Sequence, residues 1–194
     1  MARIVDTSKL DSIKEVTLHM VVEKGYGGAS IGEIAKKAGV ADGYLYRFYK
    51  SKEELVNDLF FNAVGDIMDN LEKLMKDETL TVSSIVEKLI QYLFDMANKQ
   101  PQKIKFLFVL MHEYKFNLEK EQQKKIMQLC HQLKLKGEIT NEISPDTDEE
   151  IIYLMCVSLP IQYINLRFKR FFNRSELTKK QLKSILSVCL KSLK

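Results

Sequence analysis

Apolar residues recur at three- and four-residue steps along almost the whole chain, and this spacing constrains the fold more than any other feature of the sequence. It places the apolar side chains on one face of an α-helix. Alternating β-branched runs, which are typical of strands, are missing. The sequence therefore predicts an all-α fold of about nine helices.

A chain of 194 residues can form a small domain of about 50 residues attached to one of ordinary size, and we expect a three-helix domain at 1–50 and a larger helical domain at 51–194. Pro160 falls inside one long apolar pattern, where we expect a kink rather than a break. Cap residues and apolar patterns place the helices at about 9–24, 30–38, 41–48, 52–76, 81–99, 101–116, 118–137, 147–172 and 178–193.

The composition, 45% apolar and 29% charged, is typical of a soluble globular protein. No apolar window reaches the length of a membrane span, and charge precedes any stretch that could serve as a signal peptide. We therefore expect a cytoplasmic chain with no membrane partner. Cys130, Cys156 and Cys189 are widely spaced, odd in number and set in apolar patterns, which favours reduced, buried thiols over disulfides.

Positive charge is concentrated between residues 36 and 52, although the whole chain carries only +4. Five cations in this segment face a single acid, Asp42. The cations are Lys36, Lys37, Arg47, Lys50 and Lys52. Such a patch is either an ordinary solvated face or a surface that binds a polyanion.

The segment from Ser30 to Lys52 has the pattern of a helix-turn-helix. Ser30 and Glu33 form a capping box at the start of one short helix. Gly39 permits a left-handed turn, and a second short helix rich in aromatic and basic residues follows Val40. In such a unit the first helix braces the second, whose exposed face enters a DNA major groove.

Three stretches in this order and spacing resemble the tetracycline-repressor (TetR) family of bacterial regulators. They are Val22-Glu23-Lys24-Gly25-Tyr26, Ile34-Ala35-Lys36-Lys37-Ala38-Gly39-Val40 and Leu45-Tyr46-Arg47-Phe48-Tyr49-Lys50-Ser51-Lys52-Glu53-Glu54-Leu55. The resemblance covers roughly residues 8–60. It implies a repressor that binds a palindromic operator as a homodimer, and that a small molecule releases it.

Carried over by position, the resemblance also implies a set of DNA contacts. Arg47 is the candidate for reading a guanine base. The residues implied at the groove are Asp42, Gly43, Tyr44 and Arg47, and those implied at phosphates are Ser30, Tyr46 and Lys52, with Lys50 as an extra contact.

Simpler roles remain open for several of these side chains. Asp42 either caps the third helix or accepts a hydrogen bond from a cytosine amine. Tyr46, Phe48 and Tyr49 could be core aromatics, and the spacing of Phe48 from Leu45 favours an inner position for Phe48.

A symmetric operator calls for two chains, because one recognition helix reads one half-site. The last two helices of the family pair with their symmetry mates, so two apolar stripes are candidates for the dimer interface, unless both belong to the core of one subunit. The stripes are Leu154, Val157, Ile161, Ile164 and Phe168, and Leu182, Ile185, Leu186 and Cys189.

The resemblance further implies an effector pocket in the larger domain, for an effector that the sequence does not identify. The segment 104–114 is apolar nearly all round, which indicates a buried helix. Candidate lining residues, each of which could instead be ordinary core, are Tyr92, His112, Tyr114, Met155 and Tyr163.

An all-helical enzyme or an adaptor is the competing interpretation. His112-Glu113 lacks the second histidine of a zinc-binding HExxH motif, because Phe116 occupies that position. No Cys-x-x-Cys, phosphate loop or Gly-x-Ser-x-Gly elbow occurs. We therefore expect no catalytic activity, no metal site and no cofactor.

Overall fold

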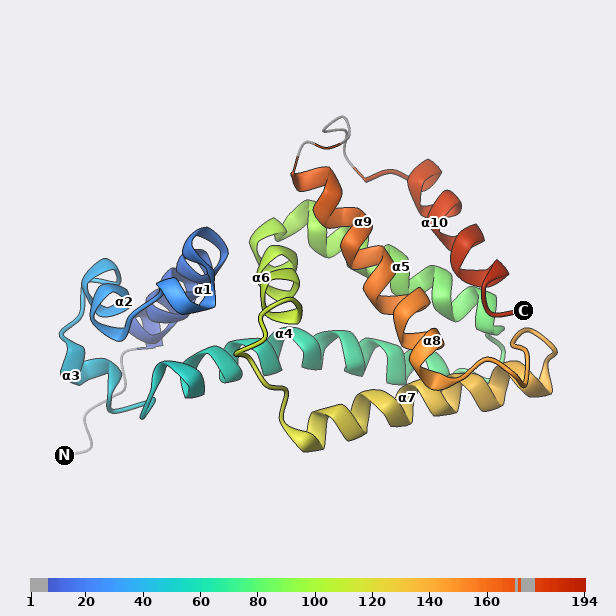
Figure 1. The fold of residues 1–194 in the computed structure, drawn as a ribbon, viewed down its shortest axis with the longest axis horizontal. Helices are drawn as coiled ribbons and strands as arrows, with labels where there is room; N and C mark the ends of the chain where they lie inside the picture. The colour runs from blue at the N-terminus through green and yellow to red at the C-terminus, as the bar shows by residue number, and fades with distance from the viewer. Residues whose placement is uncertain (1–6, 170, 172–176) are drawn as a thin grey trace. The chain divides into compact units, whose positions relative to one another are not determined.

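The computed structural model describes residues 7–169, 171 and 177–194, and helices are the only regular secondary structure in them (Figure 1). The predicted all-α fold is confirmed. The helices are α1 (Thr7–Gly28), α2 (Ile31–Lys37), α3 (Asp42–Leu45), α4 (Lys52–Met75), α5 (Val82–Lys99), α6 (Pro101–Met111), α7 (Lys120–Ile139), α8 (Glu149–Tyr153), the π-helical η1 (Leu154–Ser158), α9 (Leu159–Phe168) and α10 (Lys179–Lys191). With α8, η1 and α9 taken as one continuous rod, these described elements match the predicted number.

The chain divides into two compact units. Unit 1 comprises Met1–Val64 and Lys105–Phe116, and unit 2 comprises Gly65–Ile104 and Asn117–Lys194. The division falls inside α4 and α6, so each of these helices contributes to both units. The domain boundary expected at residue 50 stays a prediction.

Unit 1 is built on the apolar faces of the first helices, with Ile13, Ile34 and Leu45 fully buried. The last residues of the 105–116 segment join this core. The Phe116 ring lies 5.9 Å from that of Tyr26 and 5.0 Å from that of Phe60, measured between centroids. These edge-on and tilted contacts stabilise aromatic pairs, so they tie the segment to α1 and α4.

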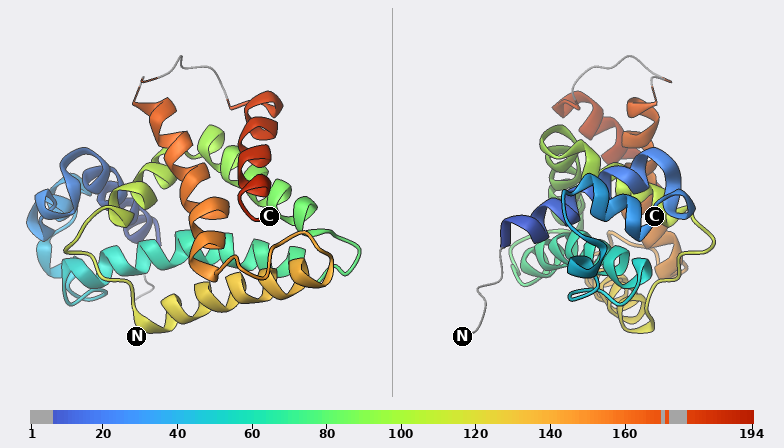
Figure 2. Two further views of the ribbon diagram at one scale, coloured as in Figure 1. Left: turned by 45° about the vertical axis from the view of Figure 1, so that its right-hand side comes forward. Right: turned by 90° about the vertical axis from the view of Figure 1, so that its left-hand side faces the viewer.

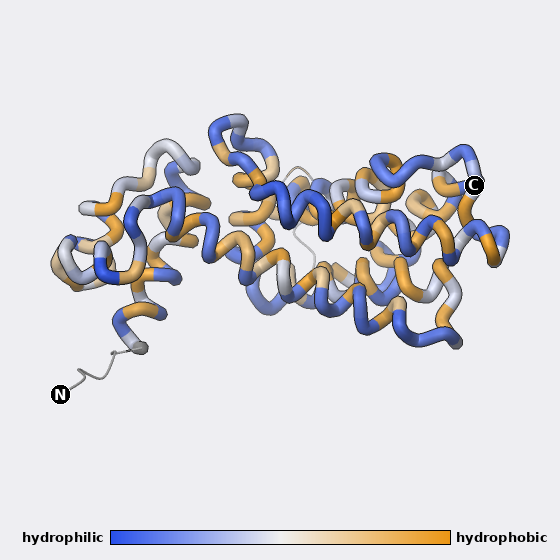
Figure 3. Tube along the Cα trace, turned by 90° about the horizontal axis from the view of Figure 1, so that it is seen from below, coloured by the Kyte–Doolittle hydropathy of each residue, from blue (hydrophilic) through white to orange (hydrophobic). Residues whose placement is uncertain are grey.

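Unit 2 is organised around α5, whose inner face is fully apolar. The helix packs against α7, η1, α9 and α10 (Figure 2). Along the helices of this unit, apolar and polar residues alternate within each turn (Figure 3), as one-sided burial requires. The buried residues of α5 are Val82, Ile85, Val86, Leu89, Ile90, Leu93, Phe94, Met96 and Ala97.

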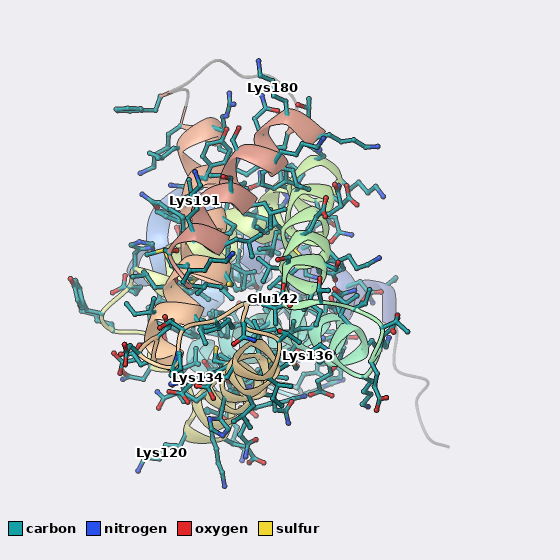
Figure 4. All side chains as sticks on the ribbon, turned by 90° about the vertical axis from the view of Figure 1, so that its right-hand side faces the viewer. Lys120, Lys134, Lys136, Glu142, Lys180 and Lys191 are labelled. Atoms are coloured by element: carbon teal, nitrogen blue, oxygen red, sulfur yellow. The ribbon has the colours of Figure 1, made fainter. Side chains whose placement is uncertain are left out.

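The loop after α7 caps the first turn of α5. The Glu142 carboxylate accepts hydrogen bonds from the backbone N–H groups of Val82 and Ser83 at 2.9 and 2.8 Å (Figure 4). Burial raises the pKa of Glu142, but these donors outweigh it and hold the pKa below its usual value. A carboxylate at this position satisfies free donors and opposes the positive end of the helix dipole.

The expected kink at Pro160 takes the form of a π-helical turn just before it. The Leu159 N–H bonds to the Leu154 oxygen, five residues back. Proline has no N–H with which to continue the normal ladder, so the helix widens ahead of it. The expectation that no apolar window reaches the length of a membrane span is corrected: within the described residues, Glu149–Phe168 is the one helix long and apolar enough to cross a membrane by length and composition alone, and it packs against α5.

Candidate nucleic-acid interface

Local hydrogen bonds build the predicted helix-turn-helix within unit 1. The Ser30 hydroxyl accepts from the Glu33 N–H at 3.3 Å and begins α2. Gly39 ends the helix with a φ of 70°, and the Val40 N–H donates to the Ala35 oxygen at 3.0 Å. That pair of features is the expected left-handed helix ending, and it turns the chain into α3.

Helix α3 and the turn that follows it expose most of the cationic and aromatic side chains that the sequence singled out. Leu45 is fully buried and anchors α3. Tyr46 is 55% exposed, whereas Tyr44 is half-buried. The exposed members of the predicted set are Ser30, Asp42, Gly43, Tyr46, Arg47 and Lys50.

Phe48 and Tyr49 lie further inward than their neighbours. Phe48 is half-buried, and its ring centroid lies 5.3 Å from that of Tyr44. Tyr49 is buried, and its hydroxyl donates to the Asp58 carboxylate at 2.7 Å. The Lys14 ammonium lies 3.0 Å from the same oxygen. Tyr49 therefore anchors the segment after α3 to α4 and α1.

The capping role expected for Asp42 is wrong. Ala41 occupies the N-cap position and supplies no side-chain bond, while Asp42 is the first helical residue. An acid in a first helical turn is still favourable. The carboxylate lies at the surface, which leaves the alternative role, acceptance from a cytosine amine, as a prediction.

Lys52 joins the end of α1 to the start of α4. Its ammonium donates to the Tyr26 backbone oxygen at 2.9 Å and lies 4.4 Å from the centroid of the Tyr26 ring. The Tyr26 hydroxyl donates to Glu53 at 3.3 Å. Burial, followed by the charge of Glu53, raises the pKa of Tyr26 to about 12. Lys52 is thus a structural cation as well as a candidate phosphate contact.

The cations of unit 1 fall into two groups. Lys24 pairs with Glu33 at 2.9 Å, and the Lys37 ammonium lies 3.9 Å from Glu23. Lys36, Arg47 and Lys50 lie at the surface and form no ion pair within the part of the chain that the structure describes. The positive charge of the predicted patch is therefore displayed on α2 and just after α3.

The helix-turn-helix segment matches a known family model. Residues 13–59 match the model described as "Bacterial regulatory proteins, tetR family". The match spans α1, α2, α3 and the first part of α4, which are the elements that build the exposed turn.

The helix-turn-helix of this chain is therefore similar to that of the TetR family.

Individual relatives match this chain over different lengths. The fatty acid metabolism regulator protein of Bacillus subtilis is 33% identical over 70 residues, 36% of each chain, so the match spans about a third of that relative. The biofilm operon regulator IcaR of Staphylococcus epidermidis, named as a negative transcriptional regulator, is 25% identical over 93% of this chain and 98% of its own.

A solved structure shares the whole fold. FadR of Bacillus subtilis, determined with stearoyl-CoA, superposes with a TM-score of 0.75 at 20% identity, covering 95% of this chain and 100% of that one. At this identity the likeness is one of fold.

The expected pocket residues do not form one buried group. Tyr114 is fully exposed and His112 also lies at the surface, its Nδ1 2.8 Å from the Phe108 oxygen. Neither lines a closed cavity here, so both expectations are corrected. Tyr92, Met155 and Tyr163 are half-buried in unit 2, and their role as pocket residues stays a prediction.

Most of the expected dimer stripe belongs to the core of unit 2. Side chains buried within one chain cannot contact a partner chain. The prediction that these residues lie in the dimer interface is therefore wrong. The buried ones are Ile161, Ile164, Leu182, Ile185 and Cys189. By contrast, Leu154 is 47% exposed, and Val157, Phe168 and Leu186 are half-buried.

The sequence missed two parts of this region. Lys9 of α1 lies with its ammonium 5.8 Å from the Tyr44 ring centroid. Phe116, which the sequence treated only as the residue that breaks a zinc motif, packs against Tyr26 and Phe60. Contacts between residues so far apart in the sequence leave no local pattern. The available signal was Lys9 itself, a lysine in a first helical turn that contains no acid.

Proposed function

We propose that this chain is a transcriptional repressor that binds a palindromic operator as a homodimer and is released by a small-molecule effector. One observation carries the proposal: a braced turn after Gly39 presents Tyr46 and Arg47 at the surface of unit 1. A buried anchor on each side, Leu45 and Tyr49, holds that turn in place. A core aromatic at position 46 would be buried, whereas Tyr46 is 55% exposed.

The side chains divide by chemistry into those that can contact bases and those that can contact phosphates. Arg47 carries a planar guanidinium that can bond both acceptors of a guanine in the major groove. Lys50 and Lys52 carry point charges suited to phosphates, and the Ser30 and Tyr46 hydroxyls can donate to phosphate oxygens. Asp42, Gly43 and Tyr44 complete the surface that faces the groove. Two such surfaces, about 34–36 Å apart, would read a two-fold operator.

A revised surface on unit 2 suits the second copy. Leu154 and Val188 are 47% and 52% exposed although they are large and apolar. Each adjoins one member of the contact between Met155 and Cys189, so both lie where η1 crosses α10. Val157 and Leu186, half-buried on the same two elements, would extend the patch. Burying it against a second copy would remove apolar surface from water.

Two further parts of the proposal concern the effector and the compartment. FadR of Bacillus subtilis, which has this fold, was solved with stearoyl-CoA; this supports an effector site in unit 2 but does not name the ligand of this chain. A repressor acts where the chromosome lies, so we place the chain in the cytoplasm. IcaR, similar over nearly the whole length, carries the words "negative transcriptional regulator" in its name, which supports repression.

Selection from random duplex DNA tests the proposal. Several rounds of binding to the full chain should enrich an inverted repeat with half-site centres about 10 base pairs apart, or a multiple of that spacing. Native mass measurement should then give two chains per duplex. As a control, Arg47→Ala combined with Lys50→Ala should enrich nothing. An adaptor or an enzyme would show no enrichment with the natural chain, and that result would overturn the proposal.

A further inference from the structure

Tyr44 is flanked by two cations, one from α1 and one from the turn after α3. The Lys9 ammonium, from the first turn of α1, lies 5.8 Å from the centre of the Tyr44 ring. The Arg47 guanidinium lies 5.9 Å from the same centre. The Phe48 ring packs against Tyr44 at 5.3 Å. The ring therefore sets the spacing between a lysine on α1 and the candidate base reader.

The position of Lys9 is unfavourable for the helix itself. The first turn of α1 contains no acid. A cation there opposes the positive end of the helix dipole, where an acid would be favoured. Lys9 also lies at the surface, on the same unit as the α3 segment. A lysine placed against the dipole and beside the α3 surface points to a role in binding.

We propose that Lys9 is a further phosphate contact of the operator complex and that Tyr44 is its positioning residue. The inference rests on the proposed function, because it needs DNA at α3. The attraction between an ammonium and the face of a tyrosine ring would hold Lys9 at the edge of the surface, while Arg47, on the same ring, addresses the bases. A major groove is about 12 Å wide. Two cations beside one ring can therefore reach the bases on the groove floor and a phosphate at the groove edge.

The chemistry assigns different roles to the two cations. An ammonium is a compact point charge that suits a phosphate, whereas a guanidinium can pair with two acceptors on one base. Loss of Lys9 should therefore weaken binding to every sequence. Loss of Arg47 should mainly weaken binding to DNA that carries the correct base pair at the position that Arg47 reads.

Titrations of labelled duplex with the full chain at several salt concentrations test this. Lys9→Ala should weaken binding to the selected operator and to unrelated DNA alike, by about 5- to 10-fold at 0.1 M salt, and should lower the salt slope by about one released counterion. Lys9→Gln should behave in the same way. Lys88→Ala, which removes one surface charge from α5, is the matched control for net charge and should change neither quantity.

The role of Tyr44 is tested by repeating Lys9→Ala in two backgrounds. Tyr44→Phe keeps the ring, so the loss caused by Lys9→Ala should persist. Tyr44→Ala removes the ring, so the loss should shrink at least threefold. If Lys9→Ala leaves the salt slope unchanged while Arg47→Ala still loses its preference at one base pair, this inference fails and the proposed function stands. If the natural chain does not bind duplex DNA, the proposed function itself fails.

Discussion

The Cys189 thiol lies 2.9 Å from the backbone oxygen of Met155 and donates a hydrogen bond to it. The Met155 oxygen receives no hydrogen bond from the backbone of residue 159 or 160, which would be its donors in an α-helix or a π-helix. The Leu159 N–H bonds to Leu154 instead, and residue 160 is a proline without an N–H. Burial raises the pKa of Cys189 to about 11, which keeps the thiol protonated as a donor. α10 therefore satisfies the carbonyl that the π-turn exposes.

A double-mutant cycle tests this relationship. Cys189→Ala should lower the free energy of unfolding by about 1–3 kcal/mol, because it leaves a buried acceptor unsatisfied and a small cavity. Pro160→Ala supplies an N–H, so the same change should cost about 1 kcal/mol less in that background. Urea denaturation measures both. Equal costs in the two backgrounds would show that the thiol acts only as a space-filling group.

Gly137 should be irreplaceable by alanine. A Cβ at this position would lie 2.3 Å from Ile143 Cγ1, in the loop that carries Glu142. Gly137→Ala should therefore destabilise the chain by about 1–3 kcal/mol, the usual range for overpacking, and a second change, Ile143→Ala, should recover part of that loss. Gly65→Ala on α4 is the control, since a Cβ there has no neighbour within 4 Å. It should be neutral or stabilising by about 0.5–1 kcal/mol; if Gly137→Ala behaved in the same way, the tight packing would be refuted.

Unit 1 should lose stability in acid through Asp58. Burial raises the pKa of this carboxyl, but the hydrogen bond from Tyr49 and the charge of Lys14 outweigh it and hold the pKa below its usual value. A lowered folded pKa gives stability that is complete above the unfolded pKa, near 3.8, and is lost as the pH falls through the lower folded pKa. Asp58→Asn should flatten stability against pH in this range. An unchanged slope would mean that other carboxylates dominate.

Charges at the revised dimer surface should separate the two chains. Leu154→Glu combined with Val188→Glu introduces two carboxylates where we propose that apolar side chains meet, so light scattering should report a monomer. Ile139→Glu is the matched control, because Ile139 is also apolar and 82% exposed but lies on α7. It should leave a dimer. A dimer in the double variant, or a monomer in the control, would place the interface elsewhere.

Local signals in the sequence were reliable where the structure depends on local chemistry. Ser30 begins α2, Gly39 ends it with a positive φ, and Thr178 caps α10 as part of a capping box. Asp148 caps α8, while the hydroxyl of the adjoining Thr147 donates to the Leu193 oxygen, a contact too distant in the sequence to leave a local signal.

Periodicity predicted which residues share a face but not what covers that face. Ile161 and Ile185 lie on apolar stripes that suit a partner chain as well as they suit the subunit's own core, and the structure buries both in the core. Lys9 was missed for a related reason, since its partner Tyr44 lies far along the sequence. The helix-turn-helix was predictable because its brace, turn and recognition segment are contiguous.

The central claim is that the exposed turn of α3 reads operator DNA, and the base preference of Arg47→Ala tests it most directly. Anisotropy titrations should show that the natural chain binds its selected operator at least about 10³-fold more tightly than a scrambled duplex. Arg47→Ala should lose about 1–3 kcal/mol of preference at one base pair and keep the rest. Equal binding to operator and scrambled DNA, or an Arg47→Ala variant with every base preference intact, would contradict the account.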